Sequence, residues 1–128
     1  SAQAAVAELD ALAPSWVIGA HGVAMLTAWC QQDAQVWLRD SLGTLRAWKV
    51  RQTAMLQSLG WTPLPSDTSY FCARPPEGVA VPALCTALRA KGIKLRDAAS
   101  FGLLGHVRLG TLSAQAQDAL LAALESSP

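Results

Sequence analysis

The chain has 128 residues, of which 52% are apolar and 15% are charged. That length fits one domain, and the composition excludes an intrinsically disordered tail. Lysine and arginine exceed the acidic residues by 10 to 9 and form no basic run, unlike the charge footprint of a nucleic-acid or anionic-membrane binder. The longest weakly polar run, residues 17–30, is too short to span a bilayer. We therefore expect a globular domain with no nucleic-acid and no membrane partner.

The start of the sequence and its cysteines suggest where the protein resides. There is no initiator methionine, and the first basic residue is Arg39, so the charged start of a secretory signal is missing. We expect a processed chain or a piece of a longer protein. Cys30, Cys72 and Cys85 show neither a Cys-x-x-Cys pair nor zinc-ligand spacing. We expect three reduced, mostly buried thiols in a cytoplasmic protein.

The first part of the chain is predicted to be helical. The alanine-rich segment 2–12 has apolar residues at helical spacing and ends before Pro14, because the residue preceding a proline disfavours helical angles. Residues 15–19 are expected to be extended, since they combine a tryptophan with β-branched side chains. Helical spacing resumes over 23–30.

The longest predicted element is a helix over residues 34–59. Asp33 offers an N-cap, and Gly60 is the expected C-terminal stop. A helix of that length would brace the whole domain. Its expected apolar stripe consists of Leu38, Leu42, Leu45, Trp48, Met55 and Leu59.

Two strands and a helix are predicted next. Residues 61–64 form a strand best placed at a sheet edge, because the prolines at and beside its end cannot donate a ladder hydrogen bond. Residues 68–74 alternate with a period of two, which is typical of a strand. The following helix opens at Pro82 and closes at Lys91 and Gly92.

The C-terminal part adds two short strands and a last helix. Apolar and polar residues alternate over 93–96 and again over 106–109, so each strand has one apolar face. Ser113 is the expected cap of the last helix. The predicted order is α-α-β-β-α-β-β-α, an α/β domain in which a small sheet of about four strands carries packed helices.

Among residues that could carry chemistry, two arginines stand out. The chain lacks a Gly-x-Ser-x-Gly elbow, a phosphate-binding glycine loop and an obvious pair of catalytic acids. Arg96 and Arg108 both lie on the polar face of a predicted strand. On adjacent strands they would grip one phosphate or carboxylate by forked hydrogen bonds. The residue pattern alone leaves open, and favours, the alternative that they lie on separate solvated edges.

Several motifs resemble a known family. The runs GIKLRD, SFGLLG and HVRLGT, followed by SAQAQDALLAAL, are similar to the closing segment of class I/II pyridoxal-phosphate-dependent aminotransferases, in particular the histidinol-phosphate aminotransferase family. The likeness extends upstream through residues 13–18, the long helix ending at Gly60 and the strand SDTSYFCAR. Ser69 departs from the asparagine common at that place, which leaves the substrate open.

The resemblance implies a fold and a role for both arginines. Residues 1–20 would be the end of the large cofactor-binding domain and the crossover from it, and residues 21–128 the C-terminal small domain. Arg108 would bind the substrate's carboxylate or phosphate, and Arg96 would help with the phosphate of histidinol phosphate. This reverses the preference for two separate solvated edges. Pyridoxal 5'-phosphate would be the cofactor of the full-length enzyme, with the large domain of the same chain and a second subunit of a homodimer as partners.

The lysine that bonds to the cofactor has no counterpart in this sequence. The family places it in a Ser-x-x-Lys-like stretch ahead of the passage that opens the chain, and Lys49, Lys91 and Lys94 match solvated helix ends or a strand face. We therefore expect no catalytic, cofactor-binding or metal-binding residue here and no activity of the isolated chain. The alternatives are a threonine-phosphate decarboxylase of cobalamin synthesis, the effector domain of an aminotransferase-like transcription regulator, or an unrelated scaffold.

Overall fold

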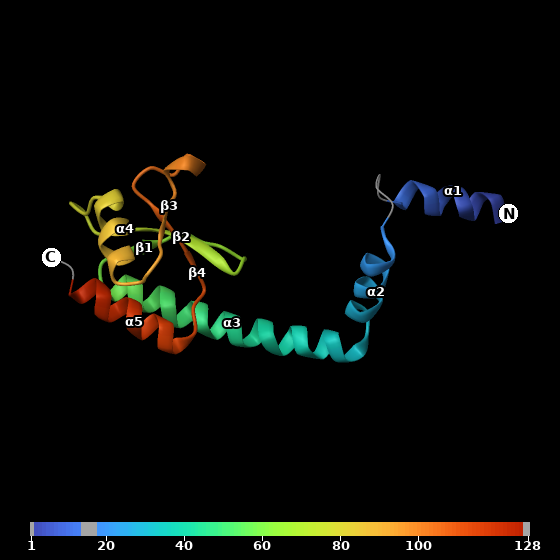
Figure 1. Ribbon diagram of the computed structural model, residues 1–128, viewed down its shortest axis with the longest axis horizontal. Helices are drawn as coiled ribbons and strands as arrows, with labels where there is room; N and C mark the ends of the chain where they lie inside the picture. Colours follow the sequence, from blue (N-terminus) through green and yellow to red (C-terminus); the bar gives the residue numbers. More distant parts are fainter. Residues whose placement is uncertain (1, 14–17, 127–128) are drawn as a thin grey trace. The chain divides into compact units, whose positions relative to one another are not determined.

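A computed structural model describes residues 2–13 and 18–126 (Figure 1). The chain divides into two compact units, Ser1–Arg39 and Asp40–Pro128, which are described in turn. Most of the passage expected to be extended, residues 15–19, lies outside the described residues.

Two helices make up most of the first unit. α1 (Ala2–Leu12) has the predicted bounds, and α2 (Ala20–Trp29) covers most of the second helical pattern. A turn at Cys30 and Gln31 separates α2 from the next helix, so three α-helices precede the first strand where the predicted order has two. Within the described residues, no helix is both long and apolar enough to cross a bilayer.

The helices of this unit leave large apolar side chains in solvent. Neither α1 nor α2 buries a residue, and Leu12 and Met25 are 82% and 71% exposed. Val6, Leu9, Val23, Leu26 and Trp29 are exposed as well. Contiguous apolar surface of this kind drives association.

We expect the purified chain to form dimers or larger species as its concentration rises. Replacing Leu9 and Leu12 together by Asn should shift the light-scattering mass towards the monomer, because the variant removes apolar surface from α1. Leu104→Asn, at a position 78% exposed in the other unit, is the matched control. A strictly monomeric wild-type chain at high concentration would contradict this prediction.

The long helix is confirmed, with a different start. α3 (Gln32–Ser58) has 27 residues, about 40 Å at 1.5 Å per residue. Asp33 is not its N-cap: the amide of Gln35 donates to the carbonyl of Gln31, so the helix begins two residues earlier than that cap would allow. Asp33 instead lies in the first turn, where its negative carboxylate interacts favourably with the positive end of the helix dipole.

The expected stop of this helix is confirmed. Gly60 has a φ of 78°, a left-handed conformation that residues with a Cβ adopt rarely. The amide of Trp61 donates to the carbonyl of Leu56, and that of Gly60 donates to Gln57. This pair of hydrogen bonds is the Schellman arrangement, which satisfies carbonyls at the helix end.

The apolar stripe predicted for α3 is partly wrong. The buried residues of this helix are Gln52 and Leu56, neither of which belongs to the stripe, while Leu42 is 38% exposed. Met55 and Leu59 do pack against the core. Only the C-terminal turns of α3 contribute to the core cluster, so a stripe drawn along the whole helix includes residues that lie outside that cluster.

The second unit contains an antiparallel sheet of four strands in the order β1-β2-β4-β3. The strands are β1 (Thr62–Pro63), β2 (Tyr70–Arg74), β3 (Arg96–Asp97) and β4 (Val107–Gly110). Each falls within or overlaps its predicted range, and β1 occupies an edge as its prolines require. β1, β2 and β3 are shorter than predicted, while β4 has the predicted length and is shifted by one residue. The mixed α/β class with one long helix is therefore confirmed.

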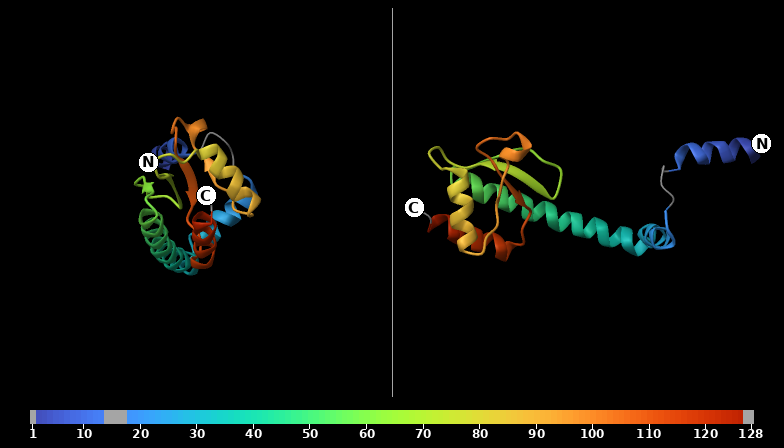
Figure 2. Two further views of the ribbon diagram at one scale, coloured as in Figure 1. Left: turned by 90° about the vertical axis from the view of Figure 1, so that its left-hand side faces the viewer. Right: turned by 45° about the horizontal axis from the view of Figure 1, so that its top comes forward.

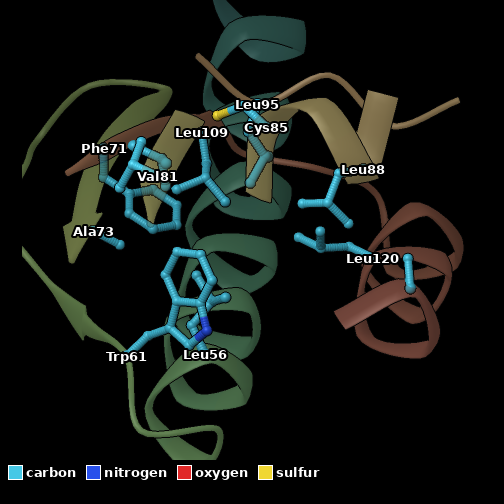
Figure 3. Packing of buried hydrophobic residues seen from close by; sticks show 12 residues of the cluster. Leu56, Trp61, Phe71, Ala73, Val81, Cys85, Leu88, Leu95, Leu109 and Leu120 are labelled. Carbon is cyan, nitrogen blue, oxygen red and sulfur yellow. The ribbon is translucent and has the colours of Figure 1, made fainter. Parts of the chain in front are cut away.

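Helices cover one face of this sheet. Phe71, Ala73, Val107 and Leu109 alternate with outward residues along β2 and β4, and they are at most 3% exposed. Against them pack side chains from α3, from α4 (Val81–Ala90) and from α5 (Ala114–Glu125) (Figure 3). The opposite face of the sheet remains available for a site.

The predicted ends of α4 and α5 are also found. Pro82 lies in the first turn of α4, and Gly92, just beyond its end, has a φ of 79°. The hydroxyl of Ser113 accepts a hydrogen bond from the amide of Ala116, which confirms the predicted cap of α5.

Two buried glutamines join α3 and α5 to the end of β4. The side chain of Gln52 donates to the carbonyl of Gly110 at 3.1 Å and accepts from the amide of Leu112 at 2.8 Å. Gln117 donates to the carbonyls of Leu112 and Trp48, both at 2.8 Å. Both glutamines are 0% exposed, and α5 runs beside α3 (Figure 2). These bonds satisfy the polar atoms of the two buried side chains and connect α3 and α5 to the chain that follows β4.

Arg51 adds a charged group to this junction. Its guanidinium donates to the side-chain oxygen of Gln117 at 2.8 Å and to the carbonyl of Ala114 at 3.2 Å. It also forms an ion pair with Asp118. Both partners of the pair are largely exposed, so the pair itself contributes little to stability and serves mainly to orient Gln117.

We expect Gln52→Leu to lower the free energy of unfolding by about 1 to 3 kcal/mol, because it removes the buried side chain that bonds to the carbonyl of Gly110 and the amide of Leu112. Urea denaturation measures this change. Gln57→Leu, at an exposed position of the same helix, is the matched control and should change it by less than about 0.5 kcal/mol. Equal free energies for the Gln52 variant and the control would contradict the role given to this side chain.

Candidate anion-binding site

Antiparallel pairing places the two predicted arginines opposite one another. Arg96 of β3 and Arg108 of β4 are direct Cα partners. Val107 and Leu109, on either side of Arg108, are buried, so Arg108 points to the face away from the helices. Directly opposite residues of a ladder have side chains on the same face. The structure therefore brings Arg96 and Arg108 together, whereas the sequence left open whether they share one site or lie on separate edges.

Two aromatic rings lie against these guanidinium groups. The central guanidinium carbon of Arg108 is 5.3 Å from the ring centroid of Tyr70 and 5.2 Å from that of Phe101. The corresponding carbon of Arg96 is 4.7 Å from the same Phe101 ring. These distances lie within the range of cation–π attraction. Both cations therefore contact one ring.

Neither aromatic residue was predicted from the sequence to belong to a site. Tyr70 lies on β2, on the outward face, and is 48% exposed. Phe101 ends the short 3₁₀ helix η1 (Ala99–Phe101) between β3 and β4 and is 50% exposed. For Phe101 the sequence did contain a signal. An aromatic residue in the segment that joins two arginine-bearing strands lies close in sequence to both strands, and so could contact both arginines.

Negative charge is directed away from the arginine pair. Among the residues that the structure describes, the ion pair found is the one between Arg51 and Asp118. Asp97, the acid next to Arg96 in sequence, accepts a hydrogen bond from the amide of Ala99 at 2.8 Å. Two like charges side by side repel each other, and a shared anion relieves that repulsion. The arrangement therefore suits an oxyanion with several acceptor oxygens, such as a phosphate or a carboxylate.

The three cysteines are free, as expected, but they differ in burial. Cys85 is buried, Cys72 is half-buried, and Cys30 is exposed, so the expectation of burial is wrong for Cys30, which ends a helix without a covering layer. Burial raises the pKa of the Cys85 thiol, and the charge of Asp97 adds to this effect. Cys85 is therefore an inert thiol of the core. The described residues contain no group of His, Cys, Asp or Glu side chains arranged to hold a metal ion.

The lysines do not fit the role of a cofactor lysine. The amino group of Lys49 donates to the carbonyl of Thr68 at 2.8 Å and to that of Ser66. Lys91 donates to the carbonyl of Ala123 at 3.1 Å and to the hydroxyl of Ser126 at 3.0 Å. These contacts engage both amino groups with main-chain carbonyls of this chain; Lys49 lies within α3 and is half-buried, so the expected solvated helix end is wrong for it. Lys94 is exposed on the loop leading to β3, outside any enclosed site.

Comparison with known proteins agrees with this architecture. Residues 1–124 match the family model of aminotransferase class I and II. A protein from Burkholderia pseudomallei K96243 described as an aminotransferase is 29% identical, with a TM-score of 0.57, over 64% of this chain and 24% of its own. The L-threonine-O-3-phosphate decarboxylase of Porphyromonas gingivalis is 27% identical, with a TM-score of 0.51, over 63% and 27%.

A third structure shows the fold over a larger part of the chain. A decarboxylase from Sulfurospirillum multivorans is 19% identical, with a TM-score of 0.76, and the similarity covers 87% of this chain and 32% of that one. No match was found among curated proteins. The chain thus spans about a quarter to a third of the length of these three relatives. It belongs to the aminotransferase class I and II family, whose members are generally pyridoxal-phosphate-dependent enzymes.

Proposed function

We propose that this chain is the C-terminal small domain of a pyridoxal-phosphate-dependent aminotransferase that acts on a small amine or amino acid with an anionic group, such as histidinol phosphate. Arg108 and Arg96 bind that anionic group. The observation that carries the proposal is their direct pairing across β3 and β4, with both guanidiniums on one ring and no carboxylate partner among the described residues.

The proposal assigns the cofactor to another part of the enzyme. Residues 1–20 would complete the large domain and the crossover, and residues 21–128 would form the small domain. In this family pyridoxal phosphate supplies an electron sink. Its lysine would come from the preceding large domain, because Lys49 and Lys91 are committed to carbonyl groups of this chain.

The contribution of this chain is to position the substrate. A planar guanidinium offers a fork of N–H donors, and two such forks fix both the place and the orientation of a phosphate or carboxylate. With one end of the substrate held, the distance from its amino group to the reacting centre is set. Such positioning lowers a reaction barrier by several kcal/mol when the geometry is right.

The second candidate is a decarboxylase that acts on a phosphorylated amino acid. The similarity to a threonine-phosphate decarboxylase favours it, since that protein is 27% identical over 63% of this chain. The same arginine pair would serve either reaction, because it contacts the anionic group and not the bond that breaks. Assay of the full-length enzyme for amino-group transfer and for release of carbon dioxide separates the two reactions.

The remaining parts of the proposal concern location and partners. We propose a cytoplasmic homodimer in which the large domain of the same chain covers apolar surface of this one. A regulator with an aminotransferase-like effector domain would carry a DNA-binding segment far upstream, which the sequence of the whole gene decides. The chain's own charge gives no support for nucleic-acid or membrane binding.

In the full-length enzyme, Arg108→Lys should reduce kcat/KM about thirtyfold or more, because the ammonium group keeps the charge but loses the planar fork. Loss of a hydrogen-bonded charge partner costs about 2 to 5 kcal/mol. Arg96→Lys should affect phosphorylated substrates more than unphosphorylated ones. Steady-state kinetics with histidinol phosphate and with an aromatic amino acid measure both effects.

The control for these variants is Arg89→Lys, at an exposed position on α4. It should leave kcat/KM unchanged, and all three variants should keep their pyridoxal-phosphate content because the cofactor's ligands would lie elsewhere. Near-normal kcat/KM of Arg108→Lys with every substrate would refute the proposed site.

The 128-residue chain alone should form no stable covalent bond with pyridoxal phosphate. Its visible spectrum after addition of the cofactor should show no stoichiometric lysine-bound band, because the amino groups of Lys49 and Lys91 are engaged by carbonyl groups of this chain. Peptide mapping after borohydride reduction checks the same point. A stoichiometric adduct trapped on Lys49, Lys91 or Lys94 would overturn the assignment of the cofactor lysine to another domain.

A further inference from the structure

We propose that Phe101 is a positioning residue that holds the guanidinium groups of Arg96 and Arg108 together in a geometry ready for an anion. This inference rests on the proposed function, since it concerns the same arginine pair. It assigns a role to a loop residue that contacts neither the sheet's core nor, in the proposal, the reacting atoms.

Electrostatic attraction to the ring counters the repulsion between the two arginines. Cross-strand partners of like charge repel each other, and although Tyr70 also contacts Arg108, Phe101 is the ring that contacts both groups. The face of an aromatic ring carries negative partial charge and attracts cations. With both guanidinium carbons within 5.2 Å of the Phe101 centroid, one ring attracts both groups and offsets their repulsion.

The second argument concerns hydrogen-bonding capacity. A carboxylate would also draw two arginines together, but it would occupy their N–H donors and neutralise the charge that attracts a ligand. A phenylalanine ring has no acceptor atom of that kind. Attraction to Phe101 therefore leaves the N–H groups of Arg96 and Arg108 available for a phosphate or carboxylate.

The third argument is that the backbone fixes this ring. The amide of Phe101 donates to the carbonyl of Ala98 at 2.9 Å, and Ala98 is buried and bonded through its own amide to His106. Asp97 accepts from the amide of Ala99 at 2.8 Å, which secures the start of η1. Gly102 follows with a φ of 80°, so the chain reverses directly after the ring.

The exposure of Phe101 separates this role from that of a core residue. The ring is 50% exposed, whereas the phenylalanine of the core, Phe71, is 1% exposed. Loss of the ring should therefore leave the fold intact, which makes substitution at this position informative.

The role of Phe101 is tested with the variants Phe101→Leu and Phe101→Tyr. The control is Leu104→Ala, at a position of the same loop that is 78% exposed. Inorganic phosphate is titrated into each 128-residue variant while the arginine Nε–Hε signals are followed by NMR. Phe101→Leu should raise the Kd for phosphate about three- to tenfold, since it removes two cation–π contacts. Phe101→Tyr retains a ring and should stay within about twofold of wild type, as should the control.

A second readout reports the geometry directly. Protons that lie over an aromatic face are shielded, so the Nε–Hε signals of Arg96 and Arg108 should be shifted upfield in the wild-type chain and in Phe101→Tyr. In Phe101→Leu the Arg96 signal should move to its ordinary position, whereas the Arg108 signal should move only in part, because the Tyr70 ring remains 5.3 Å from the Arg108 guanidinium carbon. A general loss of packing would instead shift signals throughout the domain, which the spectrum of the backbone amides shows.

Arg108→Ala distinguishes failure of this inference from failure of the proposed function. If Arg108→Ala binds phosphate as wild type does, the proposed anion site is wrong. If Arg108→Ala loses binding while Phe101→Leu keeps it, the site stands and the role of Phe101 is refuted. Equal weakening by Phe101→Leu and Phe101→Tyr would also refute it, because the effect would then not depend on the ring.

Discussion

Where β4 leaves the sheet, the main-chain groups of Gly110 and Leu112 are bonded to the helices by two buried side chains. Gln52 from α3 and Gln117 from α5 are the partners. Arg108 lies two residues before Gly110 on the same strand, and its pairing with Arg96 follows from the antiparallel ladder of β3 and β4. The strand that carries Arg108 is thus tied at its end to both α3 and α5, behind a site on the opposite face of the sheet.

The two faces of the sheet have different roles. The inner face forms the core with three helices, which gives the strands a rigid support. The outer face carries cations and aromatic rings whose charges are not neutralised by carboxylates among the described residues. Asp97 is adjacent in sequence to Arg96, yet alternation along the strand and its bond to Ala99 direct it elsewhere. The backbone thus keeps the carboxylate of Asp97 from pairing with Arg96, so that the site stays positively charged.

The sequence was sufficient to predict the elements whose boundaries depend on neighbouring residues. The caps at Gly60 and Ser113, the edge strand with its prolines and the alternation around Arg108 all depend on neighbouring residues, and each is found. Burial of Gln52 and Gln117 could not be predicted, because a buried amide needs partners more than fifty residues away along the chain. The same holds for Phe101, whose contact with two arginines depends on the pairing of β3 with β4.

Arg96 and Arg108 should together form one anion site, which a crystal structure of the 128-residue chain soaked in inorganic phosphate would reveal. We expect one phosphate on the outer face of the sheet, with nitrogen atoms of both guanidiniums about 2.7 to 2.9 Å from its oxygens and the Phe101 ring against both side chains. Diverging guanidiniums with no shared phosphate, or phosphate bound only elsewhere on the chain, would contradict it.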